Sequence, residues 1–182
     1  MSFLRKLSPA LFERDQSEVK PPPPKKWTSA YSSHRFYCLV THSGYRSSAI
    51  DLDGENILLP PDCSDGELGN ALSKALAASR MFSLKDYGPF FDANAVVARH
   101  KQWVADLMRR YQLKTKKALF TDMNLCNVTQ EGGMISISPN VHDRLEGWGR
   151  RKSMNLPTIT VAANANASEI GAALRGAFSY CR

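Results

Sequence analysis

The side chains best suited to acid–base or nucleophilic chemistry are four histidines and the hydroxyl groups beside them. His42 directly precedes Ser43, which would set a base next to a nucleophile. No third group that could orient the histidine is identifiable, so we interpret His42 as a surface turn histidine. His100 falls on an apolar helical stripe, which is typical of a core histidine. His34 and His142 lack catalytic spacing, and we therefore predict no catalytic residue.

Motifs for phosphates, dinucleotides and metals are absent from the sequence. It contains no G-x-x-x-x-G-K-[ST], G-x-G-x-x-G, G-x-S-x-G or H-E-x-x-H. Residues 51–56 are faintly like a calcium loop, but the glycine is misplaced and no glutamate closes the loop, so a hairpin turn is the better interpretation. The cysteines have neither C-x-x-C nor zinc-type spacing and are Cys38, Cys63, Cys126 and Cys181. We expect no metal, no cofactor, reduced thiols and a cytoplasmic protein.

Charged side chains offer two candidate surfaces for a partner. Six acids lie in and near a predicted hairpin and the helix start that follows, where they could form one patch: Asp51, Asp53, Glu55, Asp62, Asp65 and Glu67. In a second segment Trp148 stands among Arg144, Arg150, Arg151 and Lys152. Arginine and tryptophan are enriched in protein–protein hot spots, although arginines also grip phosphates. We take as candidate partner-binding residues Asp51, Asp53, Glu55, Asp62, Trp148, Arg150 and Arg151.

Length and composition indicate one soluble domain with an appendage. The chain has 182 residues, of which 43% are hydrophobic and 23% charged, and no apolar run is long enough to span a membrane. The net charge of +7 favours acidic partners without establishing nucleic-acid binding. Charges interrupt the N-terminal apolar residues, so no signal peptide is expected. Four prolines at 21–24 predict a stiff spacer, giving an appendage over 1–26 and a domain over 27–182.

The elements that position these residues alternate between strands and helices. Strands over 36–40, 48–52 and 57–59 predict a three-stranded antiparallel meander, with Asp53-Gly54 as a type I′ turn. A second hairpin is expected at 126–138, and a last strand at 158–161. Helices are expected after the capping box at Ser64, over 92–111, 115–123 and 139–148, and from 167 onward. These elements predict an α/β fold of the α+β type, with a mixed, mostly antiparallel sheet of about six strands and packed helices.

Two segments of the chain are similar to each other. Residues 57–80 and 159–182 each read as strand, loop and capped helix, and Gly69 and Gly171 occupy equivalent positions. Because glycine weakens a helix by about 1 kcal/mol relative to alanine, its presence suggests close backbone packing. We predict that the two helices form a pseudo-symmetric pair on one face of the sheet. The alternative is that any capped strand–helix unit would look this way.

Several segments together resemble the CdiI proteins, the immunity proteins of bacterial contact-dependent growth inhibition (CDI) systems. The matching residues include Phe36-Tyr37, Thr41–Tyr45, Ala49–Asp51, Ile57–Gly69, Trp103-Val104, Leu107-Met108, Arg110-Tyr111, Lys114–Phe120, Leu145–Trp148 and Glu169–Leu174. The likeness covers about residues 27–182 and leaves 1–26 outside.

The resemblance implies a small cytoplasmic protein without catalysis of its own. Such a protein binds the C-terminal toxin domain of a contact-delivered effector and blocks it; these toxins are frequently nucleases, often acting on tRNA. The charge of +7 departs from the acidic character common among inhibitors of basic nucleases. The alternative from another functional class is a basic nucleic-acid-binding protein or small nuclease that uses the arginine- and lysine-rich clusters.

Overall fold

The computed structural model describes residues 23–182. The predicted appendage therefore lies outside the described residues except for 23–26, and the first strand begins at Lys26. Within the described part, no helix is both long enough and apolar enough to cross a membrane.

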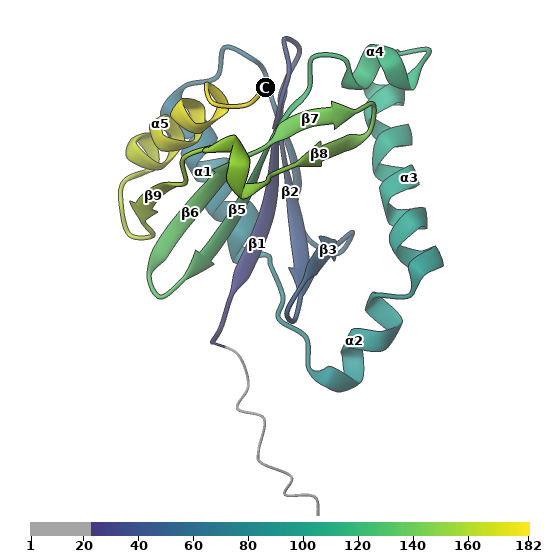
Figure 1. Cartoon of the computed structure of the whole chain (residues 1–182), viewed down its shortest axis with the longest axis vertical. Helices are drawn as coiled ribbons and strands as arrows, with labels where there is room; N and C mark the ends of the chain where they lie inside the picture. The colour runs from purple at the N-terminus through teal and green to yellow at the C-terminus, as the bar shows by residue number, and fades with distance from the viewer. Residues whose placement is uncertain (1–22) are drawn as a thin grey trace, which may run out of the picture.

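One antiparallel sheet of seven strands forms the centre of the molecule (Figure 1). Its order is β3-β2-β1-β5-β6-β9, and β4 also pairs with β2. The strands are β1 Lys26–Ser32, β2 Tyr37–Gly44, β3 Ser48–Ile50, β4 Asn56–Leu59, β5 Asn124–Glu131, β6 Met134–Pro139 and β9 Ile159–Ala162. A separate small sheet consists of β7 Val141–Arg144 and β8 Gly147–Gly149. The predicted fold class is confirmed.

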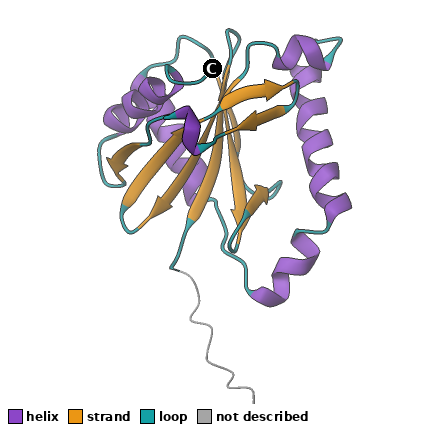
Figure 2. Cartoon of the chain, in the orientation of Figure 1, coloured by secondary structure: helices purple, strands orange, loops and turns teal. Residues whose placement is uncertain are grey.

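Helices lie on both sides of the sheet (Figure 2). They are α1 Asp65–Ala77, α2 Leu84–Phe90, α3 Ala93–Arg110, α4 Lys116–Phe120 and α5 Ala167–Phe178, with a short 3₁₀ turn over Lys152–Met154. The pair α1 and α5 packs an apolar core against one face, including Leu39, Leu72 and Leu174. On the other face α3, α4 and Trp148 enclose a second core around Trp103 and Phe120.

The predicted pair of symmetric helices is confirmed by the way α1 and α5 meet. A Cβ on Gly69 would stand 1.8 Å from the carbonyl oxygen of Ala167, and a Cβ on Gly171 would stand 1.9 Å from that of Asp65. Each glycine thus lets its helix lie against the first turn of the other. The predicted capping box at Ser64 is also present, with the Ser64 Oγ accepting from the Glu67 amide and the Glu67 carboxylate accepting from the Ser64 amide.

The predicted three-stranded meander over 36–59 is wrong, because β3 and β4 do not pair with each other. Both pair with β2, β3 along His42–Gly44 and β4 along Tyr37–Val40. Between them, residues 51–55 loop around Thr41, whose hydroxyl accepts from the Glu55 amide at 3.0 Å. Gly54 has no positive φ. It is needed because a Cβ there would come within 2.5 Å of the Thr41 side chain.

The predicted helix over 139–148 is also wrong, since this segment forms the β7–β8 hairpin. Gly147 and Gly149 flank Trp148 and lower the helix propensity of the segment. The Asn140 side chain donates to the carbonyls of Leu125 and Ser138, which satisfies backbone groups at the turn out of β6. The hairpin then lies across the sheet on the face opposite α1 (Figure 1).

Candidate functional site

The lower part of the β5–β6–β9 half of the sheet has one face without a helix over it. Strand alternation directs Val128, Ile135 and Ile137 into the core beneath α1 and α5. The intervening residues therefore face the opposite side, where the lower halves of β5 and β6 carry no helix (Figure 1). We call this surface the open strand face and define it by Asn127, Thr129, Ser136, Ser138 and Thr160.

The residues of the open strand face stand side by side across the three strands. Thr129 is opposite Ser136, which is opposite Thr160, and Asn127 is opposite Ser138. Asn127 and Thr160 are exposed and the other three are half-buried. Among the described residues, none of these side chains makes an intramolecular hydrogen bond, so their hydroxyl and amide groups are available to a partner.

A basic loop borders one end of the open strand face. The Arg150 guanidinium fastens this loop by donating to the carbonyls of Pro139 at 2.9 Å and Leu156 at 2.6 Å, and to the Thr158 hydroxyl at 3.0 Å. Arg151 and Lys152 are exposed and line a hollow of about 380 Å³ together with Asn155. The Arg150 side chain is therefore held by the loop's own backbone although the residue is exposed, while Arg151 makes no ion pair with the described residues and can meet a partner.

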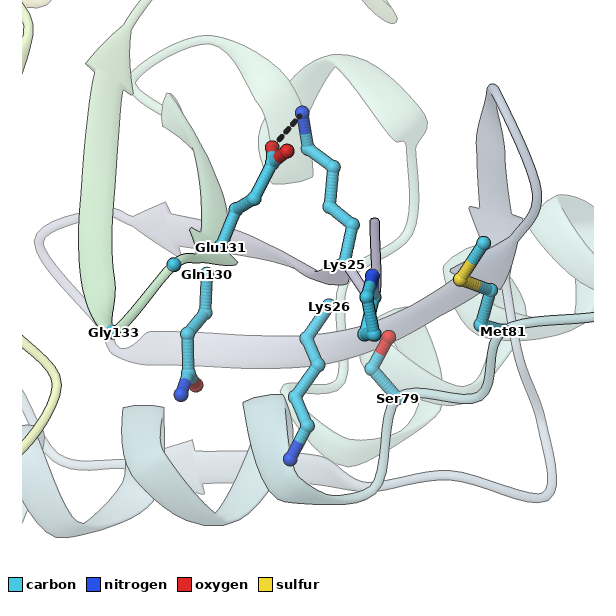
Figure 3. A pocket seen from close by; sticks show the side chains of 9 residues that line it. Lys25, Lys26, Ser79, Met81, Gln130, Glu131 and Gly133 are labelled. Atoms are coloured by element: carbon cyan, nitrogen blue, oxygen red, sulfur yellow. Dashed lines mark ion pairs between the residues drawn. The ribbon is translucent and has the colours of Figure 1, made fainter. Parts of the chain in front are cut away.

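An ion pair lies at the other end of the open strand face. The Lys25 ammonium lies 3.4 Å from the Glu131 carboxylate beside a hollow of about 290 Å³ (Figure 3). Lys26, Ser79 and Met81 also line this hollow. It contains none of the seven predicted partner-binding residues, and the ion pair compensates Lys25 but not Lys26.

Trp148, predicted to be a partner contact, anchors the β7–β8 hairpin. Its indole N–H donates to the Met123 carbonyl at 3.0 Å. The ring lies 4.7 Å from that of His142 and 5.8 Å from that of Phe120, measured between centroids. The contacts of the half-buried indole are therefore mainly with residues of the protein itself, and they stabilise the fold.

The Asp51 side chain also stabilises the fold and is hardly accessible to a partner, because it is only 2% exposed. Its carboxylate accepts from the Arg80 guanidinium at 2.6 and 2.8 Å and from the Ser43 hydroxyl at 2.5 Å. Burial alone would raise the pKa of this carboxyl, but hydrogen bonds from Arg80, Ser43 and the Asp53 amide outweigh it and hold the pKa below its usual value. Its role as a partner contact stays a prediction that this burial disfavours.

The acids of the predicted single patch are divided between the two ends of α1. Asp53 pairs with Arg80 at 3.0 Å, beyond the C-terminal end of the helix, and Glu55 pairs with Lys74 in its last turn at 3.2 Å. Asp62 and Asp65 stand at the N-terminal end. A helix of this length separates the two groups by about 20 Å. Asp62 is exposed and makes no ion pair with the described residues.

His42 and Ser43 do not form a catalytic pair. Neighbouring residues of a strand point to opposite faces, and the Ser43 hydroxyl donates to Asp51. His42 is a half-buried residue of β2 with an inaccessible Nε2, and is therefore not the surface turn histidine we expected. Burial lowers its pKa to about 4, and Asp51 offsets this only in part. In the described part of the chain, no group of three or more histidine, cysteine or acidic side chains could hold a metal ion.

Sequence reasoning missed the open strand face, although a signal for it was present. The strict alternation in Cys126-Asn127-Val128-Thr129 and in Ile135-Ser136-Ile137-Ser138 predicts one apolar and one polar face as well as a hairpin. Alternation within a strand does not indicate whether the polar face is covered, because covering depends on the position of distant segments.

Comparisons with known proteins agree on one family. The family model CdiI, "CDI immunity protein", matches residues 26–181. The immunity protein CdiI-YPIII of Yersinia pseudotuberculosis serotype O:3 (strain YPIII) is 36% identical over 172 residues, covering 86% of this chain and 95% of that protein.

Two solved structures are similar to this chain over nearly their whole length. A chain of the CdiA-CT/CdiI toxin and immunity complex from Yersinia pseudotuberculosis has a TM-score of 0.79 and 34% identity, with 87% of this chain and 98% of that chain covered. A protein of unknown function from Neisseria meningitidis, NMB0488, has a TM-score of 0.82 and 30% identity, with coverage of 87% and 96%.

Proposed function

This chain belongs to the CDI immunity protein family and neutralises a toxin of contact-dependent growth inhibition, and we propose that it does so by covering the C-terminal toxin domain of its cognate effector. The observation that carries this proposal is the match over nearly the whole described domain, joined to the fold likeness with a chain from a toxin–immunity complex. Occlusion of the toxin's active site or substrate surface is the mechanism that a binding protein of this kind can supply.

The proposal includes the absence of catalysis by this chain and a cytoplasmic location. Members of this family are in general not enzymes. The side chains best suited to chemistry support the same view, because the Nε2 atom of His42 is buried and the Ser43 hydroxyl is bound to Asp51. The proposal further takes the toxin to be a nuclease, with tRNA as a candidate substrate, because the family resemblance implies toxins of this class.

The open strand face is the surface that we assign to toxin contact. Its hydrogen-bonding side chains have no partners within the described chain, and they lie next to the exposed cations Arg151 and Lys152. Such a surface fits a polar toxin surface that presents carboxylates toward the basic loop, where complementary charges speed encounter and fix orientation. Of the residues predicted from sequence, Arg151 borders this face, and Asp53, Glu55 and Asp62 remain further candidates elsewhere.

The first experiment tests neutralisation itself. The full chain and the toxin domain encoded by its cognate effector are co-expressed, co-purified and titrated by calorimetry. We expect a stable complex, rescue of growth, and loss of RNA degradation by the toxin when the chain is present. A toxin that remains active in the presence of excess chain would overturn the proposed function. A toxin that is neutralised but never degrades nucleic acid would overturn only the nuclease assignment.

The second experiment tests the binding face with matched arginine substitutions. Asn127→Arg places a bulky cation on the open strand face, whereas Asn70→Arg places the same side chain at an exposed position of α1, on the opposite side of the sheet. We expect Asn127→Arg and Thr160→Arg to weaken toxin binding by about tenfold or more, as bulk at a contact does. Asn70→Arg should leave the affinity unchanged.

The outcomes test the proposed contact surface separately from the proposed function. If all three variants fold and bind the toxin as tightly as the parent chain, toxin neutralisation stands and the open strand face is excluded as the contact. Circular dichroism spectra that match those of the parent chain establish that the variants are folded.

A further inference from the structure

We propose that Cys126 and Cys181 form an oxidative modification site, in which a peroxide converts the two thiols into a disulfide that joins β5 to the segment following α5. The two sulfur atoms lie 3.7 Å apart, although the residues are far apart in the sequence. This inference concerns the chain alone and is independent of the identity of the toxin.

Backbone structure holds both cysteines in place. Cys126 is fully buried in β5, where it stands between Ala30 of β1 and Pro139 of β6. Cys181 lies just beyond α5, where its amide donates to the Phe178 carbonyl at 3.0 Å. The next residue is held as well, since the Arg182 carbonyl accepts from the His142 amide at 2.6 Å. Strand pairing and backbone hydrogen bonds therefore hold the two cysteines next to each other, and the Cys181 thiol also donates to the Leu125 carbonyl at 3.4 Å.

The two thiols differ in reactivity in the way that a peroxide reaction requires. Cys181 is partly exposed, and the hydrogen bond with Cys126 lowers its pKa to about 7 against the effect of burial. Hydrogen bonding to Cys181 and burial both raise the pKa of Cys126. Because Cys181 is partly exposed and Cys126 has no exposed surface, Cys181 is the thiol that meets the oxidant, and Cys126 is the resolving thiol behind it.

The chemistry balances in two steps. The Cys181 thiolate attacks one peroxide oxygen, the O–O bond breaks, and the released hydroxide takes a proton to leave as water, so that Cys181 becomes a sulfenic acid. The Cys126 sulfur then attacks the Cys181 sulfur, the S–O bond breaks, and the thiol proton leaves with the hydroxyl as a second water. Two electrons pass from the two thiols to the peroxide, and a dithiol reductant reverses the change.

The other two cysteines provide internal comparisons. Burial raises the pKa of Cys38 to about 12, and its thiol donates to the Asn56 side chain. Cys63 is 6% exposed, and burial likewise raises its pKa. Among the described residues, no other pair of sulfur atoms comes into contact. The thiols of Cys38 and Cys63 are therefore expected to stay reduced under mild oxidation.

The test treats the purified, reduced full chain with a small excess of hydrogen peroxide and counts free thiols after denaturation. We expect the count to fall from four to two, and the mass to fall by about 2 Da through loss of two hydrogens. Peptide mapping should show the link between the peptides containing Cys126 and Cys181. The oxidised form should unfold at a higher urea concentration, and a reductant should return it to the starting midpoint.

Matched serine variants make the result decisive. Cys63→Ser should still lose two thiols and show the same link, whereas Cys181→Ser should lose none to a disulfide under the same treatment. A link through Cys38 or Cys63, oxidation of Cys181 to sulfinic acid without a link, or four free thiols after treatment would each overturn the proposal.

Discussion

Asp51 shows how a single carboxylate joins three segments of the chain. It lies at the end of β3, accepts from Ser43 in β2, and binds Arg80 beyond α1. The side chain of Arg80 is 46% exposed, so water solvates part of its charge while that of Asp51 has only protein partners. The pair therefore stabilises the connection between the sheet edge and α1 more than an ordinary surface ion pair would.

We predict that Asp51→Asn lowers the free energy of unfolding by about 1.5–3 kcal/mol at pH 7, the range for a hydrogen bond to a charged group. Because the native pKa of Asp51 is lowered, its stabilising contribution is present above the unfolded-state pKa of about 3.9 and is lost as the pH falls through the native pKa. The difference between variant and parent should therefore shrink at low pH. Urea unfolding at pH 7 and pH 3 measures it.

The matched control for this prediction is Asp62→Asn, which changes an exposed acid without an ion pair among the described residues. Its effect should stay within about 0.5 kcal/mol. Equal stability of Asp51→Asn and the parent chain at pH 7 would show that the buried pair contributes nothing net.

His42 gives the stability a second pH dependence. Burial lowers its native pKa to about 4, whereas an unfolded histidine titrates near 6.5. Between these two values the unfolded chain binds a proton that the native ring excludes, so stability falls as the pH decreases, by at most about 1.4 kcal/mol per pH unit. We predict that His42→Gln flattens the curve of unfolding free energy against pH between 6.5 and 4. A slope identical to that of the parent would contradict it.

At the scale of elements, the packing of α1 on α5 depends on two glycines. Because a Cβ at Gly69 or Gly171 would come within 2 Å of a backbone oxygen, an alanine there must separate the helices. We predict that Gly69→Ala and Gly171→Ala each lower the unfolding free energy by about 2–3 kcal/mol through overpacking. Thermal or urea unfolding measures the loss.

Gly176, in the same helix as Gly171, is the natural comparison. A Cβ there would have nothing within 4 Å, so Gly176→Ala should be neutral or stabilise the protein by up to about 1 kcal/mol. A similar loss in all three variants, or no loss in Gly69→Ala and Gly171→Ala, would mean that close contact between the helices does not control the outcome.

At the scale of the whole molecule, the two hydrophobic cores on either side of the sheet are built from residues of the described domain. The family match begins at residue 26, and β1 begins at Lys26. We predict that deletion of residues 1–22 leaves the urea midpoint unchanged and changes toxin affinity by less than about twofold, within the scatter expected when no contact is lost. Calorimetric titration and urea unfolding of the shortened chain measure both. Weaker binding at an unchanged midpoint would place a toxin contact in the deleted segment.

The charges behind the net charge of +7 are distributed unevenly over the folded protein. Most acids of the predicted patch are paired within the protein, Asp53 with Arg80, Glu55 with Lys74, and Asp65 with Arg175. Arg151 and Lys152, in contrast, have no ion pair among the described residues and border the open strand face. The surface offered to a partner is therefore more basic than the distribution of acids in the sequence suggested.

Elements whose signals are local could be predicted correctly from the amino-acid sequence. The Ser64 capping box, the apolar stripe of α1 and the glycines at 132–133 each act over a few residues, and all three form the structures that their residue types predict. The alternation in β5 and β6 likewise determined which side chains share a face. The equivalence of Gly69 and Gly171 even predicted a long-range contact, because glycine in a helix has few other physical reasons to be there.

Strand pairing and the compensation of charges, in contrast, became known only from the folded structure. β3 and β4 share one partner because residues 51–55 loop around Thr41, and the segment after Pro139 is a hairpin because Trp148 packs between rings supplied by distant elements. The burial of Asp51 likewise depends on its ion pair with Arg80, a residue distant in the sequence. These outcomes depend on contacts between residues far apart in the chain, and the energies of such contacts leave no pattern in the short windows where local propensity is expressed.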